Sequence, residues 1–169
     1  MTVTVADSAQ RLAALDPHRS FAVAAPAGSG KTELLIQRVL RLLALVDEPE
    51  EILCMTFTRK AAGEMQHRVV EALVRASKNE QSQSNSQQGD SQSCNGRPNN
   101  HQQTTLDLAT EALAQDQVRG WRLLENPNRL RIQTIDGFCL NLAQQLAVES
   151  SFGDYSEPLN DPTPYYREV

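Results

Sequence analysis

Cysteines are few in this 169-residue sequence, and they form no framework. Only 3 are present, Cys54, Cys94 and Cys139, and no two of them make a C-x-x-C pair. An odd and unclustered set of cysteines argues against both a disulfide framework and a zinc site. A reducing cytoplasm is the compartment that fits such a chain best.

A membrane-spanning stretch and a secretory signal are lacking as well. The most apolar run, LLIQRVLRLLALV, is interrupted by Arg38 and Arg41 and is shorter than the roughly 20 apolar residues that a membrane helix needs. The first residues, MTVTVADSAQ, have neither the basic segment nor the apolar core of a signal peptide. We therefore expect a soluble cytoplasmic protein.

An excess of positive charge is also absent. With 16 Lys and Arg against 21 Asp and Glu, the formal net charge is -5. Any nucleic-acid site must then be a local patch on an acidic molecule. The length and the 40% hydrophobic content suffice for one domain with its own core.

Apolar runs that alternate with amphipathic stretches predict an α/β fold with a parallel sheet. Strands are expected at SFAVAA (20–25), ILCMTF (52–57) and LRIQTI (130–135). The second run is apolar without alternation, which predicts a strand covered on both faces.

Five helices are expected around these strands. They run from Asp7 or Ser8 to about Leu15, and over 31–46, 59–76, 104–125 and 136–150, with Thr104 or Thr105 capping the fourth and Asp136 the fifth. In the second helix, apolar residues at three- and four-residue spacing predict a buried stripe: Leu34, Leu35, Val39, Leu42, Leu43 and Val46.

Residues 79–103 differ in composition from the rest. They are almost entirely Gln, Ser, Asn and Gly, without one aliphatic side chain. Such a segment cannot offset the entropy lost on ordering, so we expect a disordered surface insertion between two helices. A polar tract that recruits a partner is the alternative.

The segment APAGSGKT (25–32) fits the phosphate-binding template G-x-x-x-x-G-K-[ST], except that Ala25 or Pro26 stands where the first glycine should be. It lies between a predicted strand and a predicted helix, as this chemistry requires. The missing glycine is at the entry of the loop, so we expect the loop still to hold phosphates. A glycine-rich turn before a helix is the alternative.

Each part of the loop has a chemical role in this interpretation. The amides of 27–32 converge on a phosphate, and the following helix adds its positive dipole end. Gly28 and Gly30 permit a close backbone approach. Lys31 supplies a charge to the β- and γ-phosphates, and Thr32 supplies a hydroxyl to Mg²⁺.

Four segments together resemble the UvrD/RecB-type superfamily-one DNA helicases. AQRLAAL, APAGSGKT, ILCMTFTRKAAGEM and IQTIDGFC look like the Q motif and motifs I, Ia and Ib of that family. The similarity runs from about residue 7 to about residue 153, without the polar insertion. The segments APAGSGKTELLIQR and RLRIQTIDGFC are most similar to the AddA-like, exonuclease V beta-like branch, whose full-length members resect double-strand breaks.

The resemblance implies a P-loop NTPase fold of RecA-like type, with a parallel sheet and flanking helices, incomplete at its C-terminal end. Residues 1–153 would be the N-terminal part of a helicase ATP-binding domain, with 79–103 as the insertion. Residues 154–169 would begin an accessory subdomain or a linker.

ATP and Mg²⁺ are the cofactors that the resemblance implies. Gln10 stands where the family reads the adenine edge, and an amide can donate and accept hydrogen bonds at once. Arg38 matches a recurrent family arginine, with a solvated helix position as the alternative. The loop contacts would be Ala25, Pro26, Ala27, Gly28, Ser29, Gly30, Lys31 and Thr32, with Lys31 and Thr32 catalytic and Thr32 reaching Mg²⁺ through the bound ATP.

Single-stranded DNA is the expected partner of motif Ia. Thr58 would bond a phosphate and Phe57 would stack on a base, contacts that tolerate any sequence. Arg59 replaces an asparagine common in the family, and Lys60 follows it. Basic residues predict a local patch, although a solvated helix face is the alternative: Arg59, Lys60, Arg68, Arg75 and Lys78.

Motif Ib departs most from the family pattern. Thr134 is retained as a DNA contact, and Phe138 is retained too, but Asp136 replaces the family's histidine. An aspartate cannot donate to a phosphate, so we expect it to cap the helix. Two residues upstream either compensate for it or merely flank the strand: Arg129 and Arg131.

The chain contains no apolar strand ending in a D-E-x-x-D run, and the family's later motifs, second RecA-like domain and nuclease domain are absent. We therefore expect the ATP- and single-stranded-DNA-binding N-terminal portion of a helicase, from a helicase–nuclease of double-strand-break repair that has a nuclease or helicase partner, and inactive alone. A truncated, non-motor regulatory module is the alternative. A small-molecule kinase would leave TFTRKAA unexplained.

Overall fold

The structure is a computed structural model that describes residues 8–84 and 100–145. The elements in chain order are α1 (Ser8–Ala13), α2 (Lys31–Leu43), the 3-10 turn η1 (Pro49–Glu51), β1 (Leu53–Thr56), α3 (Arg59–Ser84), α4 (Asn100–Arg119), the 3-10 turn η2 (Pro127–Arg129), β2 (Arg131–Thr134) and α5 (Ile135–Gln145). A small parallel sheet with helices confirms the predicted mixed α/β class. In the part of the chain described, no helix has the length and apolar character to span a bilayer.

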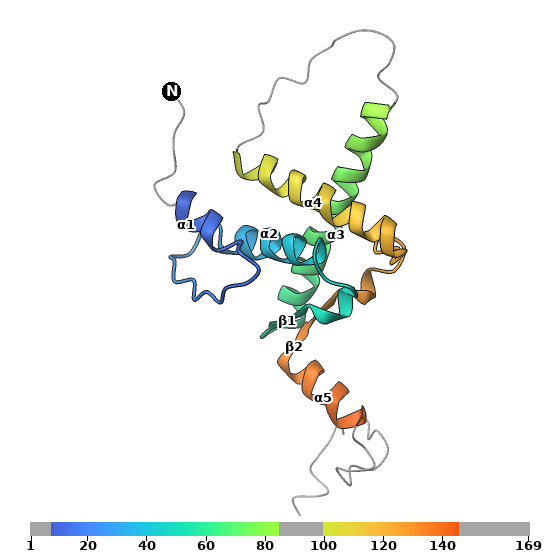
Figure 1. Cartoon of the computed structure of the whole chain (residues 1–169). Coiled ribbons are helices and arrows are strands. Elements are labelled where there is room, and N and C mark those ends of the chain that lie inside the picture. The colour runs from blue at the N-terminus through green and yellow to red at the C-terminus, as the bar shows by residue number, and fades with distance from the viewer. Residues whose placement is uncertain (1–7, 85–99, 146–169) are drawn as a thin grey trace, which may run out of the picture.

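Helices α2, α3 and α4 pack against one another and form the core. Figure 1 shows α4 crossing α2 and α3, with the two strands below them. The contact is made by side chains from which solvent is almost excluded, among them Leu40 of α2, Leu73 of α3 and Leu113 of α4. Each such leucine contributes about 1.5–3 kcal/mol by its burial. Leu15, just after α1, also packs against this core.

The buried face of α2 differs in detail from the predicted stripe. Val39 and Leu43 are buried as predicted, but Leu35 is 49% exposed and Ile36 is only 2% exposed. The helix also ends at Leu43 rather than near residue 46. The period of the pattern is therefore correct, whereas Leu35 is wrongly included, Ile36 and Leu40 are missed, and the predicted end of the helix is wrong.

Strands β1 and β2 are parallel neighbours, with Leu53 opposite Arg131 and Thr56 opposite Thr134. The expectation that β1 is covered on both faces is wrong. Cys54 packs toward the helical core, whereas Met55 is 55% exposed. One face of the strand therefore contacts the helices and the other contacts solvent.

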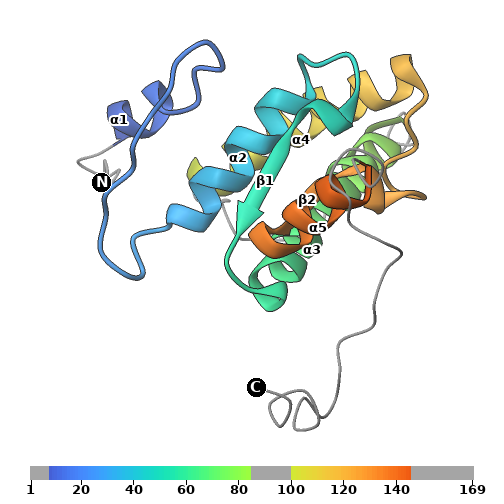
Figure 2. The same ribbon diagram turned by 90° about the horizontal axis from the view of Figure 1, so that it is seen from below.

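The strand expected at 20–25 is also wrong. This segment leads into the glycine loop as irregular chain, and Phe21 and Val23 are exposed. A strand exists only where a neighbour accepts its backbone hydrogen bonds, and the described sheet consists of β1 and β2 alone. Figure 2 shows the segment running apart from β1.

Both helices that flank the polar stretch are longer than predicted. Helix α3 continues to Ser84, and α4 begins at Asn100 instead of being capped at Thr104 or Thr105. Residues 79–84 and 100–103 are therefore helical, which contradicts disorder at both ends of the stretch. Propagation adds one hydrogen bond per residue once the packed part of a helix has formed, so polar residues can extend it. Residues 85–99 lie outside the described part of the chain.

The other end of α4 is set by a glycine. The helix ends at Arg119, and Gly120 adopts a left-handed φ of 68° with its amide donating to the carbonyl of Asp116. This is the usual use of glycine just beyond a helix. The predicted helix to residue 125 is therefore too long. Asp7, the alternative cap of α1, the end of the fifth predicted helix and the boundary near 153 lie outside the described residues.

Arg129 joins the two turns that precede the strands. Its guanidinium, in η2, lies 2.6 Å from a Glu50 oxygen and 2.8 Å from a Glu48 oxygen at η1. The hydrogen bond from Arg129 lowers the pKa of Glu50. Because η1 leads into β1 and η2 into β2, this cluster fixes how the strands start beside each other. Arg129 is therefore engaged in the fold and does not compensate for Asp136.

Substitution of Leu40 tests the core. Leu40→Ala should lower the free energy of unfolding by about 2–5 kcal/mol, because a fully buried side chain is replaced by a cavity. Leu35→Ala in the same helix is the matched control and should cost less than about 1 kcal/mol. Urea titrations followed by circular dichroism measure both. Equal losses would contradict the burial pattern of α2.

Glu50 gives the fold a defined pH dependence. Its folded-state pKa lies below the ordinary 4.5, so its contribution is complete above that value and is lost as the pH falls through the folded-state pKa. Wild type should therefore be more stable than Glu50→Gln at neutral pH, and the difference should shrink in acid. Denaturant titrations across this range measure it. A difference that does not change with pH would exclude this linkage.

Candidate functional site

The glycine loop is shaped by two left-handed residues. Gly28 has φ 78° and Gly30 has φ 81°, a region that residues with a side chain rarely adopt. A Cβ at Gly28 would meet nothing within 4 Å, so the requirement for glycine there is conformational and not spatial. Gly30 is also the residue from which α2 begins. The loop and the start of the helix are thus one backbone unit.

Lys31 bridges the entry of this loop. Its Nζ lies 2.5 Å from the carbonyl oxygen of Ala25 and 2.7 Å from that of Pro26. These two residues occupy the positions at which the template departs from its first glycine. The lysine charge is therefore held at the loop by backbone carbonyls. Thr32 follows it, exposed, in the first turn of α2.

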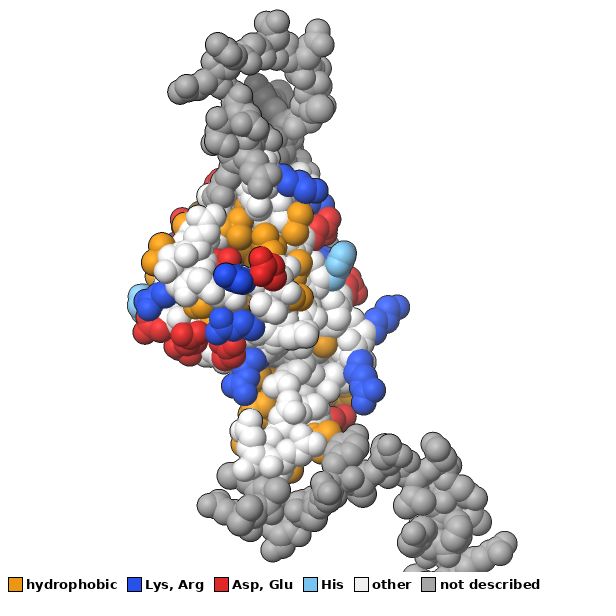
Figure 3. All heavy atoms as spheres, turned by 90° about the vertical axis from the view of Figure 1, so that its right-hand side faces the viewer, with side chains coloured by type: hydrophobic (Ala, Val, Ile, Leu, Met, Phe, Trp, Pro, Cys, Tyr) orange, Lys and Arg blue, Asp and Glu red, His pale blue; other side chains and the backbone are white. Residues whose placement is uncertain are grey.

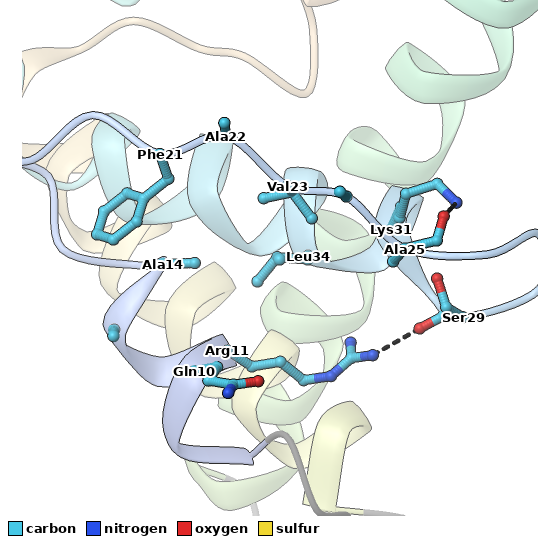
Figure 4. Close-up of a pocket in the computed structure, with 12 residues that line it drawn as sticks. Gln10, Arg11, Ala14, Phe21, Ala22, Val23, Ala25, Ser29, Lys31 and Leu34 are labelled. Carbon is cyan, nitrogen blue, oxygen red and sulfur yellow. Dashed lines mark hydrogen bonds between the residues drawn. The ribbon is translucent and has the colours of Figure 1, made fainter.

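A cavity of about 390 Å³ opens beside the loop. Gln10 from α1 lines it together with Ala25, Ser29 and Lys31 from the loop, and Figure 4 shows these side chains around one space. The structure thus brings Gln10 and the loop lysine to one cavity. Five other predicted contacts lie in the loop but do not line the cavity: Pro26, Ala27, Gly28, Gly30 and Thr32.

Arg11 is a site residue that the sequence did not single out. Its Nη2 donates to the carbonyl oxygen of Ser29 at 2.5 Å, and its guanidinium would be 3.4 Å from a Cβ at Gly30. The hydroxyl oxygen of Ser29 is buried without a hydrogen-bond partner among the residues that the structure describes. The only sequence signal was the position of Arg11 directly after Gln10.

The Arg38 guanidinium donates hydrogen bonds to backbone carbonyls outside the phosphate loop. Nη1 lies 2.6 Å from the carbonyl oxygen of Ala14 and 3.0 Å from that of Asp16, and Nη2 lies 2.8 Å from that of Arg19. The guanidinium carbon is also 5.4 Å from the ring centroid of Phe21. Arg38 does not line the cavity, although Ala14 and Phe21 do.

The predicted DNA contacts of motif Ia surround the junction of β1 and α3. Phe57 is 87% exposed, more than any other large hydrophobic residue described. The Thr58 hydroxyl oxygen accepts a hydrogen bond from the Ala61 amide at 3.1 Å and so caps α3. Arg59 and Lys60 are exposed in the first turn. An aromatic face and positive charge therefore meet at this helix end.

Motif Ib forms a second helix start at the same edge of the sheet. The Thr134 hydroxyl oxygen accepts a hydrogen bond from the Gly137 amide at 3.1 Å, and α5 begins at Ile135. Thr134 is therefore the cap, and the assignment of that role to Asp136 is wrong because Asp136 already lies in the first helical turn. Thr134 pairs with Thr56, so α3 and α5 both start near this end of the parallel strands.

The predicted basic patch is smaller in the structure. Arg68 pairs with Glu64 and Arg75 pairs with Glu71, each at 2.7 Å within α3. Such pairs neutralise most of the field that the arginines would project. The positive charge that remains next to Phe57 is that of Arg59 and Lys60.

Comparisons with known proteins give the chain its family. The family model of the UvrD/REP helicase N-terminal domain matches residues 6–160. An ATP-dependent helicase/nuclease subunit from Bacillus velezensis is 45% identical over 58 residues, which are 32% of this chain and 5% of that protein. DNA helicase II is 46% identical over 61 residues in Salmonella typhimurium and 44% identical over 61 in Escherichia coli, in each case 36% of this chain and 8% of the relative.

The aligned part of the chain thus spans less than a tenth of the length of these relatives. No solved structure matches. Because the family model covers most of the sequence, and the glycine loop and both strand–helix junctions lie within it, the chain belongs to the UvrD/REP helicase N-terminal domain family.

Proposed function

We propose that this chain is the ATP- and single-stranded-DNA-binding portion of an ATP-dependent DNA helicase with a RecA-like P-loop fold. One observation carries the proposal: Gln10 and Lys31, from separate elements, line one cavity beside a glycine loop. An amide that recognises a base and an ammonium that binds phosphate are the groups that a nucleotide site needs.

The loop residues fit a triphosphate. The phosphates would contact the amides of residues 27–32 at the start of α2, where the helix dipole favours an anion. The Lys31 ammonium would exchange the carbonyls of Ala25 and Pro26 for phosphate oxygens. Mg²⁺ bound with ATP would neutralise phosphate charge, and the exposed Thr32 hydroxyl is the group that would reach it. Gln10 would hydrogen-bond the adenine edge.

A single DNA strand would lie across the ends of β1 and β2. Phe57 offers a stacking face, and Arg59 and Lys60 offer positive charge. Thr58 and Thr134 each accept a hydrogen bond from a helix amide, and each hydroxyl keeps a proton that it can donate to a backbone phosphate. None of these contacts depends on base identity, which suits a protein that moves along any sequence.

The helicase–nuclease context is part of the proposal as well. The Bacillus velezensis relative is named as one subunit of an ATP-dependent helicase/nuclease, which supports a partner protein, and we infer a role in double-strand-break repair in the cytoplasm. None of the described residues that line the cavity is Asp or Glu, so they offer no carboxylate to orient an attacking water. We therefore expect this chain alone to bind ATP and hydrolyse it negligibly.

Removal of the loop lysine tests the nucleotide site. Lys31→Ala should weaken Mg-ATP binding by about 10- to 150-fold, because charge-assisted hydrogen bonds to phosphate are lost. Isothermal titration calorimetry measures the dissociation constant. Lys78→Ala, which removes an exposed lysine of α3, is the matched control. Equal affinity of wild type and Lys31→Ala would exclude the loop as the phosphate site.

Truncation of the exposed aromatic tests the DNA surface. Phe57→Ala should weaken binding of a fluorescent oligo-dT by roughly 5- to 150-fold, the loss of one stacked base. Fluorescence anisotropy at fixed salt measures the affinity. Val118→Ala removes another exposed hydrophobic side chain, 80% exposed near the end of α4, and should have no effect. Similar affinities for wild type and Phe57→Ala would place the DNA elsewhere.

A further inference from the structure

We propose that Arg38 and Arg11 are positioning residues that join α1 to the phosphate loop, and that this link sets the preference of the site for adenine. The inference rests on the proposed function, because it concerns which base the cavity accepts. It assigns neither arginine a direct contact with the nucleotide.

Arg38 connects α2 to the chain that follows α1. Its guanidinium donates to the carbonyl oxygens of Ala14, Asp16 and Arg19, at 2.6, 3.0 and 2.8 Å. The amide of Ala14 in turn donates to the carbonyl oxygen of Gln10 at 3.0 Å. Two consecutive hydrogen bonds, through Ala14, therefore link Arg38 to the backbone of Gln10.

The same guanidinium also holds a wall of the cavity. The Phe21 ring lines the cavity, and the guanidinium carbons of Arg38 and Arg19 each lie 5.4 Å from its centroid. Cation–π contacts at this distance contribute about 0.5–1 kcal/mol at exposed sites. The loss of Arg38 would therefore remove one of the two cation–π contacts of Phe21 together with the hydrogen bonds to the carbonyls around Ala14.

Arg11 provides a second connection, from α1 to the phosphate loop. It extends from α1 to the carbonyl oxygen of Ser29 in the loop, as the dashed line in Figure 4 marks. Figure 1 shows α1 beside the start of α2, outside the layer formed by α2, α3 and α4. A short helix in this place depends on such links to keep its position relative to the loop.

The two halves of the cavity divide the recognition of the nucleotide. The phosphate half, formed by Ala25, Ser29 and Lys31, is continuous with α2. The base half, formed by Gln10, belongs to α1. A displacement of α1 would spoil the hydrogen bonds from Gln10, which tolerate only about 0.5 Å, and would leave the phosphate contacts in place. The arginine link should therefore govern base preference more than phosphate affinity.

Arginine is required for this task because of its shape. A planar guanidinium presents five N–H donors in a fixed fork and can bond several carbonyls from one position. A lysine in its place keeps the positive charge but is a single point donor on a flexible stem. Arg38→Lys therefore separates geometry from charge.

The test compares the dissociation constants of ATP, GTP and inorganic tripolyphosphate for the 169-residue chain, each with Mg²⁺. For Arg38→Lys and Arg38→Ala, the preference for ATP over GTP should fall by about tenfold. Tripolyphosphate affinity should stay within about twofold, since the loop is intact. Arg41→Ala is the matched control, because Arg41 lies on the same helix, is paired with Glu111, and does not line the cavity.

Each outcome has a distinct meaning. An equal loss for all three ligands would indicate that Arg38 only stabilises the fold, and would overturn the inference. Wild-type preference retained in Arg38→Lys would also overturn it. If Arg38→Ala does not fold by circular dichroism, Arg38→Lys and Arg11→Lys still decide the question. A wild type that binds ATP and GTP equally would overturn the proposed adenine site itself.

Discussion

The left-handed backbone at Gly28 and Gly30 is the constraint on which the rest of the site depends. It turns the chain into α2, and the Lys31 ammonium at the start of that helix lies against the carbonyls of Ala25 and Pro26. Ala25 and Pro26, which stand where the template has its first glycine, thus bind the lysine through their carbonyl oxygens. These contacts use only backbone atoms, so they form although neither entry residue is glycine.

The rest of the fold places two surfaces around this loop. The buried core packs α2 against α3 and α4, and α1 is attached to α2 and the loop by Arg38 and Arg11. The parallel strands bring the starts of α3 and α5 to one edge. Figure 3 shows small groups of hydrophobic side chains among charged ones on the face that it draws. Met55, Phe57 and Ile135, at the strand–helix junctions, are exposed. The proposed base, phosphate and DNA contacts therefore come from different elements that share one core.

The sequence predicted what depends on local patterns. A short run of residues is enough to predict each of these features: the glycine template, the strands β1 and β2, and the helices that follow them. Prediction from the sequence failed where the structure of a segment depends on residues far away in the chain. Residues 20–25 have strand character but no neighbouring strand in the described part of the chain, and Asp136 is a good cap residue that Thr134 precedes. The hydrogen bonds of Arg11 and Arg38 cross 18 to 24 positions, and no spacing in the sequence encodes them.

The proposed function requires one nucleotide to contact α1 and the glycine loop at the same time. The most direct measurement is an NMR titration of the ¹⁵N-labelled chain with a non-hydrolysable Mg-ATP analogue. The signals of the Gln10 side-chain amide and of the backbone amides of residues 27–32 should shift together, with one dissociation constant, while those of α4 amides near Arg119 should not shift. Loop shifts without a Gln10 shift, or no shift in the loop, would contradict it.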